Sequence, residues 1–569
     1  MEAKAAHLHT YFLFPFAVDK EAVMQDHPQV WAKKEHWIEG LDAWIGDVER
    51  GAGSVVADRI GRWVRDPYRR FDLNSPAYQD MVFFHPFVRR VFFDTGDAGG
   101  PQSEQESLLR IYSIPLTPHR EQGRQLIYCA EDSRGRSSSL EATDLRMMLF
   151  ANGIGILSIG VEALGVDLPQ CLWANEMMRK VYPSSGRQVR EGRTPKRFAL
   201  EWQTPAGRQT LVEERFEACS MTGFLPPLSK IITELLYFAN YPEQEYEPVL
   251  DERMIVYTYL AVDPATVEPD FDQTEEYEIL MSRLLYVDRW GESYRYESEF
   301  TREAMRRQVY RRWAHQGTLY GFTSYSNVTL CMGAFDCGEH QLREGFLIHR
   351  MFTTRYFLTV TVALFYRATL LDFSERTALV SRQLHRKQAS TITEDDILQA
   401  GQLMAEFQHF SNYWYFSELA NKDEEIEHFQ SQCESYRLDP MKREIEQEVE
   451  KLSQSLERFY MLRNTEAVNR LAMLSMILGG GAMMTGFFGM NFGRQFEEVF
   501  FNPKGNPWAH VAAVSAISAL TVGSLAFAIY LVAANWRDYK LILLPRSWRG
   551  RAQQESLRRV PGWIQFEDE

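Results

Sequence analysis

Long apolar runs are scarce in this sequence, and their scarcity limits where the chain can cross a membrane. Its mean hydropathy is -0.34, 24% of its residues are charged and its formal net charge is -15. A helix needs about 20 apolar residues to cross ~30 Å of hydrocarbon. Only the windows 471–490 and 511–534 reach that length without a charge. The shorter apolar stretch 356–366 lies between Arg355 and Arg367, so we predict a buried helix of a soluble domain there.

Cysteine is also rare, with six residues in a chain of 569. No CxxC pair or framework spacing occurs, which excludes a disulfide scaffold and indicates reduced thiols in a cytosolic domain. Cys331, Cys337 and His340 lie close in sequence and could ligate a metal, but a buried strand with a nearby loop histidine is the favoured explanation. The apolar segment 10–18 has no small-residue cleavage site and runs into charged residues, so we predict a first β-strand and no signal peptide.

Several functional signatures are missing as well. The chain has no dinucleotide-binding or phosphate-cradling glycine loop, no internal repeat and no catalytic motif. We therefore expect neither an enzyme nor a bound cofactor. The acidic balance gives no reason to expect a nucleic-acid partner.

The order of patterns along the chain predicts an α/β or α+β cytosolic domain over residues 1–340. Polar, glycine-rich breaks near 94–107 and 184–194 are candidate seams between subdomains. Strand-like runs and helix-like runs alternate between these breaks. The strand-like runs are 81–84, 110–114, 145–160 and 254–262, and the helix-like runs are 34–48 and 226–239.

Residues 341–438 are predicted to be a helical cytosolic region. One helix is expected over 343–387, and a second begins near Thr393, where Asp396 completes a capping-box signature. A third begins at Asp439-Pro440 and has no break, so residues 439–491 are predicted to be a stalk and first transmembrane helix about 78 Å long. Apolar residues spaced by three and four indicate a coiled-coil seam on the stalk: Ile445, Val449, Leu452, Leu456 and Phe459.

The C-terminal part is expected to form a two-helix transmembrane hairpin. Residues 492–507 make the connecting loop, 508–536 the second transmembrane helix and 537–569 a basic cytosolic tail. Arginines and lysines concentrate before the first span and after the second. The positive-inside rule then places both termini in the cytosol and the loop outside, as in a multi-pass protein of the inner (plasma) membrane.

The end of the first span reads FFGMNFG, with Phe488 before and Phe492 after the tripeptide Gly489, Met490, Asn491. A short loop with acids and a second apolar span follow. This arrangement resembles the CorA family of magnesium channels, which carry a Gly-Met-Asn turn at the outer end of the first of two C-terminal spans. The resemblance extends upstream through the stalk to HFSNYWYFSELAN at 409–421. It implies a homopentameric funnel whose first span lines the pore, with the tripeptide as selectivity filter.

The chemistry of the turn is compatible with Mg²⁺. This ion sheds water reluctantly, so a ring of neutral amide oxygens from Asn491 can hold it through its hydration shell without trapping it. Glu497 and Glu498 in the loop stand where they can concentrate cations, although an ordinary solvated loop has the same composition.

Small side chains at near-helical spacing mark one face of the first span. Such a stripe either lines a pore or lets helices pack closely in lipid. The stripe lacks the bulky apolar constrictions usual in the family. Its members are Thr465, Val468, Asn469, Ala472, Ser475, Gly479, Ala482 and Gly486.

One acidic cluster is a regulatory candidate, and Glu450 and Glu457 are the stalk acids nearest the membrane. The cluster Asp423, Glu424, Glu425 and Glu427 is either a solvated helix face or a site where cytosolic Mg²⁺ binds between subunits, as the resemblance implies. In the stalk, Gln454 stands where family members tend to carry an acidic ring.

Three functions therefore remain open. The first is passive Mg²⁺ transport gated by the cytosolic domain. The second is transport of zinc or another transition metal, which the stripe disfavours because it has no histidine or cysteine. The third is a CorA-like membrane effector whose enlarged cytosolic domain binds a small regulatory messenger.

Overall fold

The computed structural model describes residues 3–32, 34, 36–47, 51, 53–67, 82–94, 107–181, 186–216, 228–241, 245–250, 253–291, 296–333, 347–386, 393–489 and 506–534. In the two C-terminal helices only some side chains are described. The chain divides into two compact units, Met1–Glu450 and Lys451–Glu569. The first unit is built around a β-sheet, and the second is helical where it is described.

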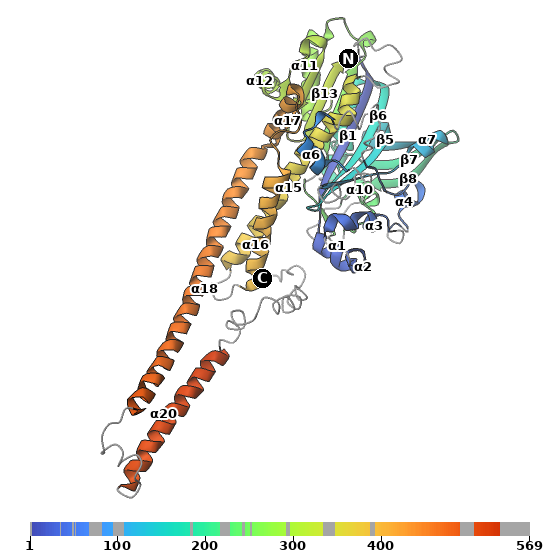
Figure 1. The fold of residues 1–569 in the computed structure, drawn as a ribbon. Coiled ribbons are helices and arrows are strands. Elements are labelled where there is room, and N and C mark those ends of the chain that lie inside the picture. The colour runs from blue at the N-terminus through green and yellow to red at the C-terminus, as the bar shows by residue number, and fades with distance from the viewer. Residues whose placement is uncertain are drawn as a thin grey trace. The chain divides into compact units, whose positions relative to one another are not determined.

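A sheet of 13 strands forms the centre of the first unit (Figure 1). Three strands join it at the side: β3 (Leu109–Ser113), β2 (Val64–Arg65) and β9 (Tyr246–Pro248). Among the described pairs, only β10 with β13 is parallel. In order across the sheet, the main path is β11 (Val309–Tyr310), β12 (Thr318–Phe322), β13 (Ser326–Met332), β10 (Ile255–Val262), β1 (Lys4–Val18), β6 (Ile154–Asp167), β5 (Ser137–Phe150), β4 (Gln125–Glu131), β7 (Arg197–Thr204) and β8 (Gly207–Arg215).

One continuous sheet therefore carries strands from before and after both breaks near 94–107 and 184–194, and the predicted α+β class of this unit is confirmed. Short helices surround the sheet: α1 (Lys20–Asp26), α2 (Pro28–Trp31), α3 (Leu41–Ile45), α4 (Val55–Arg59), α6 (Pro86–Phe92), α7 (Thr117–Glu121), α8 (Leu168–Met178), α9 (Gly186–Arg190), α10 (Lys230–Leu235), α11 (Glu275–Tyr286) and α12 (Ser298–Gln308).

The strand predicted at 10–18 is the core of β1, which pairs with β10 on one side and β6 on the other. Because side chains alternate along a strand, β1 presents two sets of contacts. Thr10 donates a hydrogen bond to Asn175 of α8 (2.9 Å), whereas the ring of Tyr11 packs on Phe357 on the opposite face. Helices cover both faces, which explains why β1 is apolar almost throughout.

Several predicted elements have different bounds in the structure. The run 145–160 is a hairpin, because the turn at Asn152 and Gly153, with φ +97° at the glycine, separates β5 from β6. The strand predicted at 81–84 is wrong, since Val82 and Phe83 are helical and Phe84 forms an isolated bridge with Ala420. The helix predicted over 34–48 is broken into η1 (Trp37–Gly40) and α3, and that over 226–239 is shortened to α10.

The helix predicted over 343–387 is present from Leu347 to Arg386. It consists of α14 (Leu347–Met351), the π-helical turn η8 (Phe352–Tyr356) and α15 (Phe357–Arg386). Among the helices whose side chains are all described, this is the one that is long and apolar enough to cross a membrane. Its most apolar window is 78% buried within the protein, and α15 packs on β1 and β6. The prediction that 356–366 belongs to a buried helix is confirmed.

The next helices along the chain begin close to the residues that the sequence predicts as their starts. Helix α16 (Glu394–His409) begins with the predicted capping box of Thr393 and Asp396. Helix α17 (Asp423–Tyr436) ends at Arg437 in the left-handed conformation, and α18 (Leu438–Gly489) starts directly after it, just before the predicted Asp439-Pro440. All five predicted seam side chains of α18 are buried. A last helix, α20, runs from Pro507 to Ala534.

Candidate functional site

The predicted pore face lies on α18. Its described members are all exposed in the single chain: Thr465, Val468, Ala472, Ser475, Gly479 and Ala482. The side chains of Asn469 and Gly486 are not described. Gly489 is the last residue of α18, whereas Met490, Asn491, Glu497 and Glu498 lie outside the described residues. The structure therefore describes part of the stripe and leaves the filter turn and outer acids as predictions.

Large apolar side chains are also exposed on both C-terminal helices. Val468 on α18 is 62% exposed, and Trp508 and Tyr530 on α20 are 82% and 66% exposed. Several large apolar side chains exposed on the same helices are unusual on a soluble monomer.

The predicted regulatory acids lie at the start of α17, where three of them have partners within the protein. Glu425 is 5% exposed and accepts a hydrogen bond from Nη1 of Arg355 (3.1 Å). Glu424 accepts one from the hydroxyl of Tyr356 (2.8 Å). Both donors belong to η8, so these contacts fasten α17 to the buried helix.

The other two acids of the group are less constrained. Glu427 accepts hydrogen bonds from the hydroxyl of Tyr310 and from Nη1 of Arg312. Asp423 is exposed. In the single chain the group therefore serves mainly as an anchor, which sequence alone did not indicate.

The candidate metal ligands Cys331, Cys337 and His340 form no metal site within the described structure. Cys331 lies fully buried on β13, where its thiol donates to the hydroxyl of Tyr259 (3.4 Å), as expected for a buried strand residue. Cys337 and His340 lie outside the described residues.

Sequence reasoning missed a cavity of about 590 Å³ in the first unit. Its charged lining consists of Arg179, Arg253, Arg367 and Asp288, and three tyrosines contribute rings. Arg179 and Arg253 are brought together because their segments pair: the amide of Met254 donates to the carbonyl of Arg179 (2.8 Å). The full lining is Arg179, Leu250, Arg253, Ile255, Tyr286, Asp288, Tyr296, Ser324, Tyr325 and Arg367. No local sequence motif indicates this cavity, because its lining residues come from five separate segments of the chain.

Positive charge prevails in this cavity. Burial, followed by the nearby Arg253, lowers the pKa of Arg179 to about 10. Among the lining residues of the described structure, Asp288 is the one acid, and burial, followed by Glu176, raises its pKa to about 6. The guanidinium of Arg179 lies over the ring of Tyr325, 5.0 Å from its centre, and its Nε has no hydrogen-bond partner among the described residues.

These groups suit an anionic organic ligand. Guanidinium groups pair with carboxylate or phosphate oxygens, and the tyrosine rings offer planar surfaces against which a flat group can stack. Three arginines with a single acid leave a net positive charge that such a ligand would compensate.

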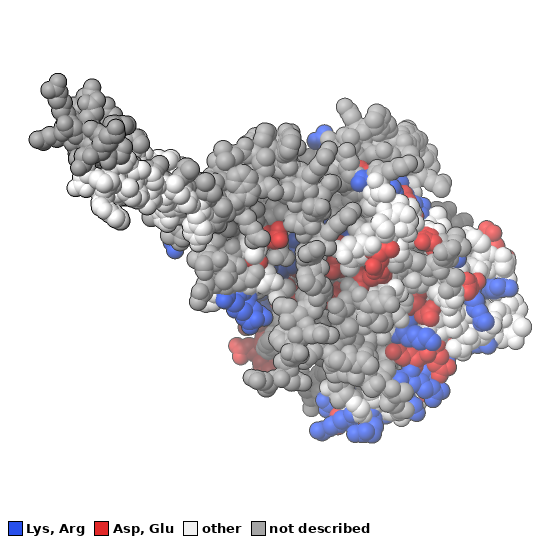
Figure 2. Space-filling model, turned by 90° about the horizontal axis from the view of Figure 1, so that it is seen from below, with Lys and Arg blue, Asp and Glu red and all other residues white. Residues whose placement is uncertain are grey.

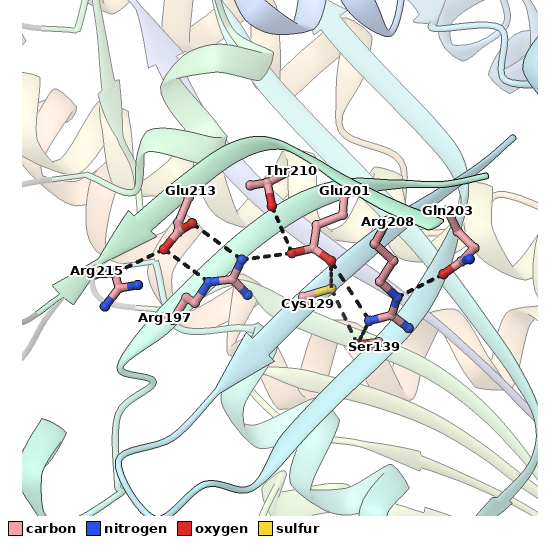
Figure 3. Close-up of polar contacts among 9 residues, drawn as sticks. All are labelled: Cys129, Ser139, Arg197, Glu201, Gln203, Arg208, Thr210, Glu213 and Arg215. Carbon is pink, nitrogen blue, oxygen red and sulfur yellow. Dashed lines mark hydrogen bonds and ion pairs between the residues drawn. The ribbon is translucent and has the colours of Figure 1, made fainter. Parts of the chain in front are cut away.

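Another charged group, on strands β7 and β8, is compensated internally (Figure 3). Glu201 is nearly buried and lies between Arg197 (2.8 Å) and Arg208 (3.9 Å). Glu213 pairs with Arg197 and with Arg215, at 3.2 and 3.0 Å. Each charge in this network has an opposite neighbour, so the network does not form a ligand site. Charged side chains on the edge strand β8 discourage that strand from pairing with another chain. On the face shown in Figure 2, acidic and basic side chains of the described surface are likewise intermixed.

No protein-family model matches this chain, and no curated protein matches it.

Proposed function

We propose that the protein is a CorA-like divalent-cation channel that conducts Mg²⁺ passively across the inner (plasma) membrane. The observation that carries this proposal is the Gly489-Met490-Asn491 turn between two uncharged windows of spanning length. An unbroken α18 that reaches Gly489, and a second long helix α20, support it. In this proposal the two helices form the transmembrane hairpin, and both chain termini are cytosolic.

The exposed apolar side chains of α18 and α20 support a membrane location and an oligomer. A single helix cannot enclose a pore, so several copies must contribute α18, and a homopentameric funnel is the arrangement that the resemblance implies. The stripe from Thr465 to Ala482 would then face the pore, and the larger side chains would face lipid or neighbouring helices.

No chemical energy source is needed for uptake. Moving the two charges of Mg²⁺ across 100 mV is worth about 4.6 kcal/mol. In the narrowest part, Asn491 from each copy would accept hydrogen bonds from the water bound to the ion. A neutral ring holds a hydrated cation weakly, which conduction requires.

A second candidate is favoured by the arginine-lined cavity. A channel that responds only to Mg²⁺ has no need of a cationic, aromatic cavity in its cytosolic unit. If an anionic messenger binds there, the protein is a ligand-gated effector built on the same membrane module. Zinc transport remains a weaker alternative, because the described stripe offers oxygen and aliphatic groups rather than histidine or cysteine.

Ion flux from purified protein in liposomes tests the proposal. We expect the parent protein to admit Mg²⁺ down a membrane potential. Asn491→Ala should lose the preference for divalent over monovalent cations. Asn502→Ala, a matched substitution in the segment between the two helices, should behave like the parent. Size-exclusion chromatography checks that all three assemble. Mg²⁺ flux through Asn491→Ala equal to that of the parent would contradict the proposed filter. A parent that stays closed until a soluble extract is added would favour the effector.

A further inference from the structure

Four potential metal ligands converge in the first unit, outside every site described above. His7 and His9 lie two positions apart on β1 and so point to the same face of the sheet. Glu162 lies on β6 directly opposite His9. His349 belongs to α14, at the beginning of the buried helix 347–386. The fold thus brings together side chains from the two ends of the first unit.

The distances among the four side chains are those of a coordination sphere. Nδ1 of His9 lies 2.9 Å from Nε2 of His349 and 3.0 Å from a carboxylate oxygen of Glu162. Nε2 of His7 lies 3.7 Å from the other oxygen of Glu162. One ligand atom from each residue falls within 4.8 Å of all the others. Four ligands about 2.0–2.1 Å from a tetrahedral Zn²⁺ are themselves separated by roughly 3.3 Å.

The cluster is partly buried, with His9 buried and the other three residues of intermediate exposure, and not all of its ring nitrogens have partners in the described structure. His9 is 2% exposed, and Nε2 of His7 is buried with no hydrogen-bond partner in the described structure. Burial, only partly opposed by Glu162, lowers the pKa of His9 to about 3, and burial lowers that of His349 to about 4. Neutral imidazole is the form of histidine that binds metal.

We propose that His7, His9, Glu162 and His349 bind a single transition-metal ion of the Zn²⁺ type. Three imidazoles and one carboxylate suit zinc, whereas Mg²⁺ prefers six oxygen ligands and keeps much of its water. The ion is a resident of the cytosolic unit and is distinct from the transported Mg²⁺, so this proposal stands whether or not the protein is a channel.

The position of the site indicates what the metal does. Two ligands come from the central strand β1, one from β6 and one from the first turn of the helix 347–386. A bound ion therefore links the sheet to the start of the helix that runs between the sheet domain and the later helices. Metal binding should stabilise the folded unit, because the unfolded chain has no preformed site.

His428 provides a matched control within the same unit. It is also buried, its Nε2 also has no partner in the described structure, and burial lowers its pKa to about 3. It lies against the rings of Tyr310, Tyr320 and Tyr356, at 4.7, 4.4 and 4.8 Å, and no second histidine contacts it among the described residues. A buried histidine without co-ligands should not bind zinc.

The test uses full-length protein in detergent, stripped with a chelator, dialysed against micromolar Zn²⁺ and analysed for metal content. The parent should hold one zinc ion per chain more than His349→Ala and Glu162→Gln, and His428→Phe should match the parent. With Co²⁺ in place of Zn²⁺, the parent should show the visible absorption of a tetrahedral site, and the two ligand variants should not. Zinc should raise the thermal midpoint of the parent but not that of His349→Ala.

Glu162→Gln, at a partly exposed position, keeps the test decisive if the histidine variant folds poorly. Equal zinc content in the parent and a folded Glu162→Gln, together with an unchanged cobalt spectrum, would overturn the proposal. So would a stripped parent that takes up no zinc.

Discussion

The side chain of His428 is buried in surroundings that favour its neutral form over its protonated form. Tyrosine and phenylalanine rings surround it, and Arg312 adds to the effect of burial in lowering its pKa from the ordinary 6.5 to about 3. Between these two values the unfolded chain binds a proton that the folded protein does not. The free energy of unfolding therefore falls as the pH falls from 6.5 toward 3.

Replacing this residue with phenylalanine should make the protein less sensitive to acid. Between pH 6.5 and 3, one such group changes the free energy of unfolding by up to about 1.4 kcal/mol for each pH unit. Denaturant unfolding at several pH values between about 4 and 6 should give a slope shallower by nearly one proton for His428→Phe. An unchanged slope would mean that His428 is protonated in the folded state.

Asp288 should govern the pH dependence of ligand binding in the arginine-lined cavity. It faces Arg179, Arg253 and Arg283, lies near Glu176 and accepts a hydrogen bond from Tyr296. Because its pKa is raised to about 6, it gains negative charge as the pH rises through that value and then opposes an anion.

Binding of adenosine 3′,5′-cyclic monophosphate, which combines a flat base with a phosphodiester of constant charge, should therefore weaken as the pH rises from about 5 to 7. Asp288→Asn should bind more tightly at neutral pH and lose this dependence, whereas Arg179→Gln should bind at least tenfold more weakly. Calorimetry on the full chain measures all three. Equal binding by the parent and Arg179→Gln would rule out the cavity as an anion site.

At the scale of elements, the start of α17 is attached to the buried helix through η8. Breaking a buried ion pair from one side leaves an uncompensated charge, which typically costs about 3–5 kcal/mol. The pair of Glu425 with Arg355 is nearly inaccessible, whereas Asp423, two positions earlier, is exposed.

Glu425→Ala should therefore lower the free energy of unfolding by roughly 3 kcal/mol, and Asp423→Ala should change it by less than about 0.5 kcal/mol. Unfolding with denaturant measures both. If instead Glu425→Ala leaves stability intact but abolishes a response to cytosolic Mg²⁺, the acids form the regulatory cation site that the sequence suggested.

At the scale of the whole molecule, the distribution of arginine and lysine predicts the topology. A cysteine introduced at Asn502 should react with membrane-impermeant thiol reagents added outside intact cells, and one introduced at Ser547 should react only after permeabilisation. The parent protein measures background labelling of the six native cysteines. The opposite pattern would place the loop in the cytosol and remove the proposed role of Glu497.

The elements that sequence patterns predicted well are those set by local interactions. The capping box at Thr393, the long helix 347–386 and the apolar seam of α18 each depend on residues within a few turns of one another. The turn at Asn152-Gly153 is equally local, but it lies within the apolar run 145–160, so the pattern predicts one strand where the structure has two.

What the sequence by itself determined is the order of parts: a mixed domain, a helical region, a continuous helix from Leu438 to Gly489 and a second apolar helix. Only the tertiary structure decided which distant side chains meet. The sheet places β1 between β6 and β10 and brings His349 to His9, 340 positions away, and Arg367 to the same cavity as Arg179. Local periodicity carries no information about such pairings, because they follow from strand order and from the face of the sheet on which each helix packs.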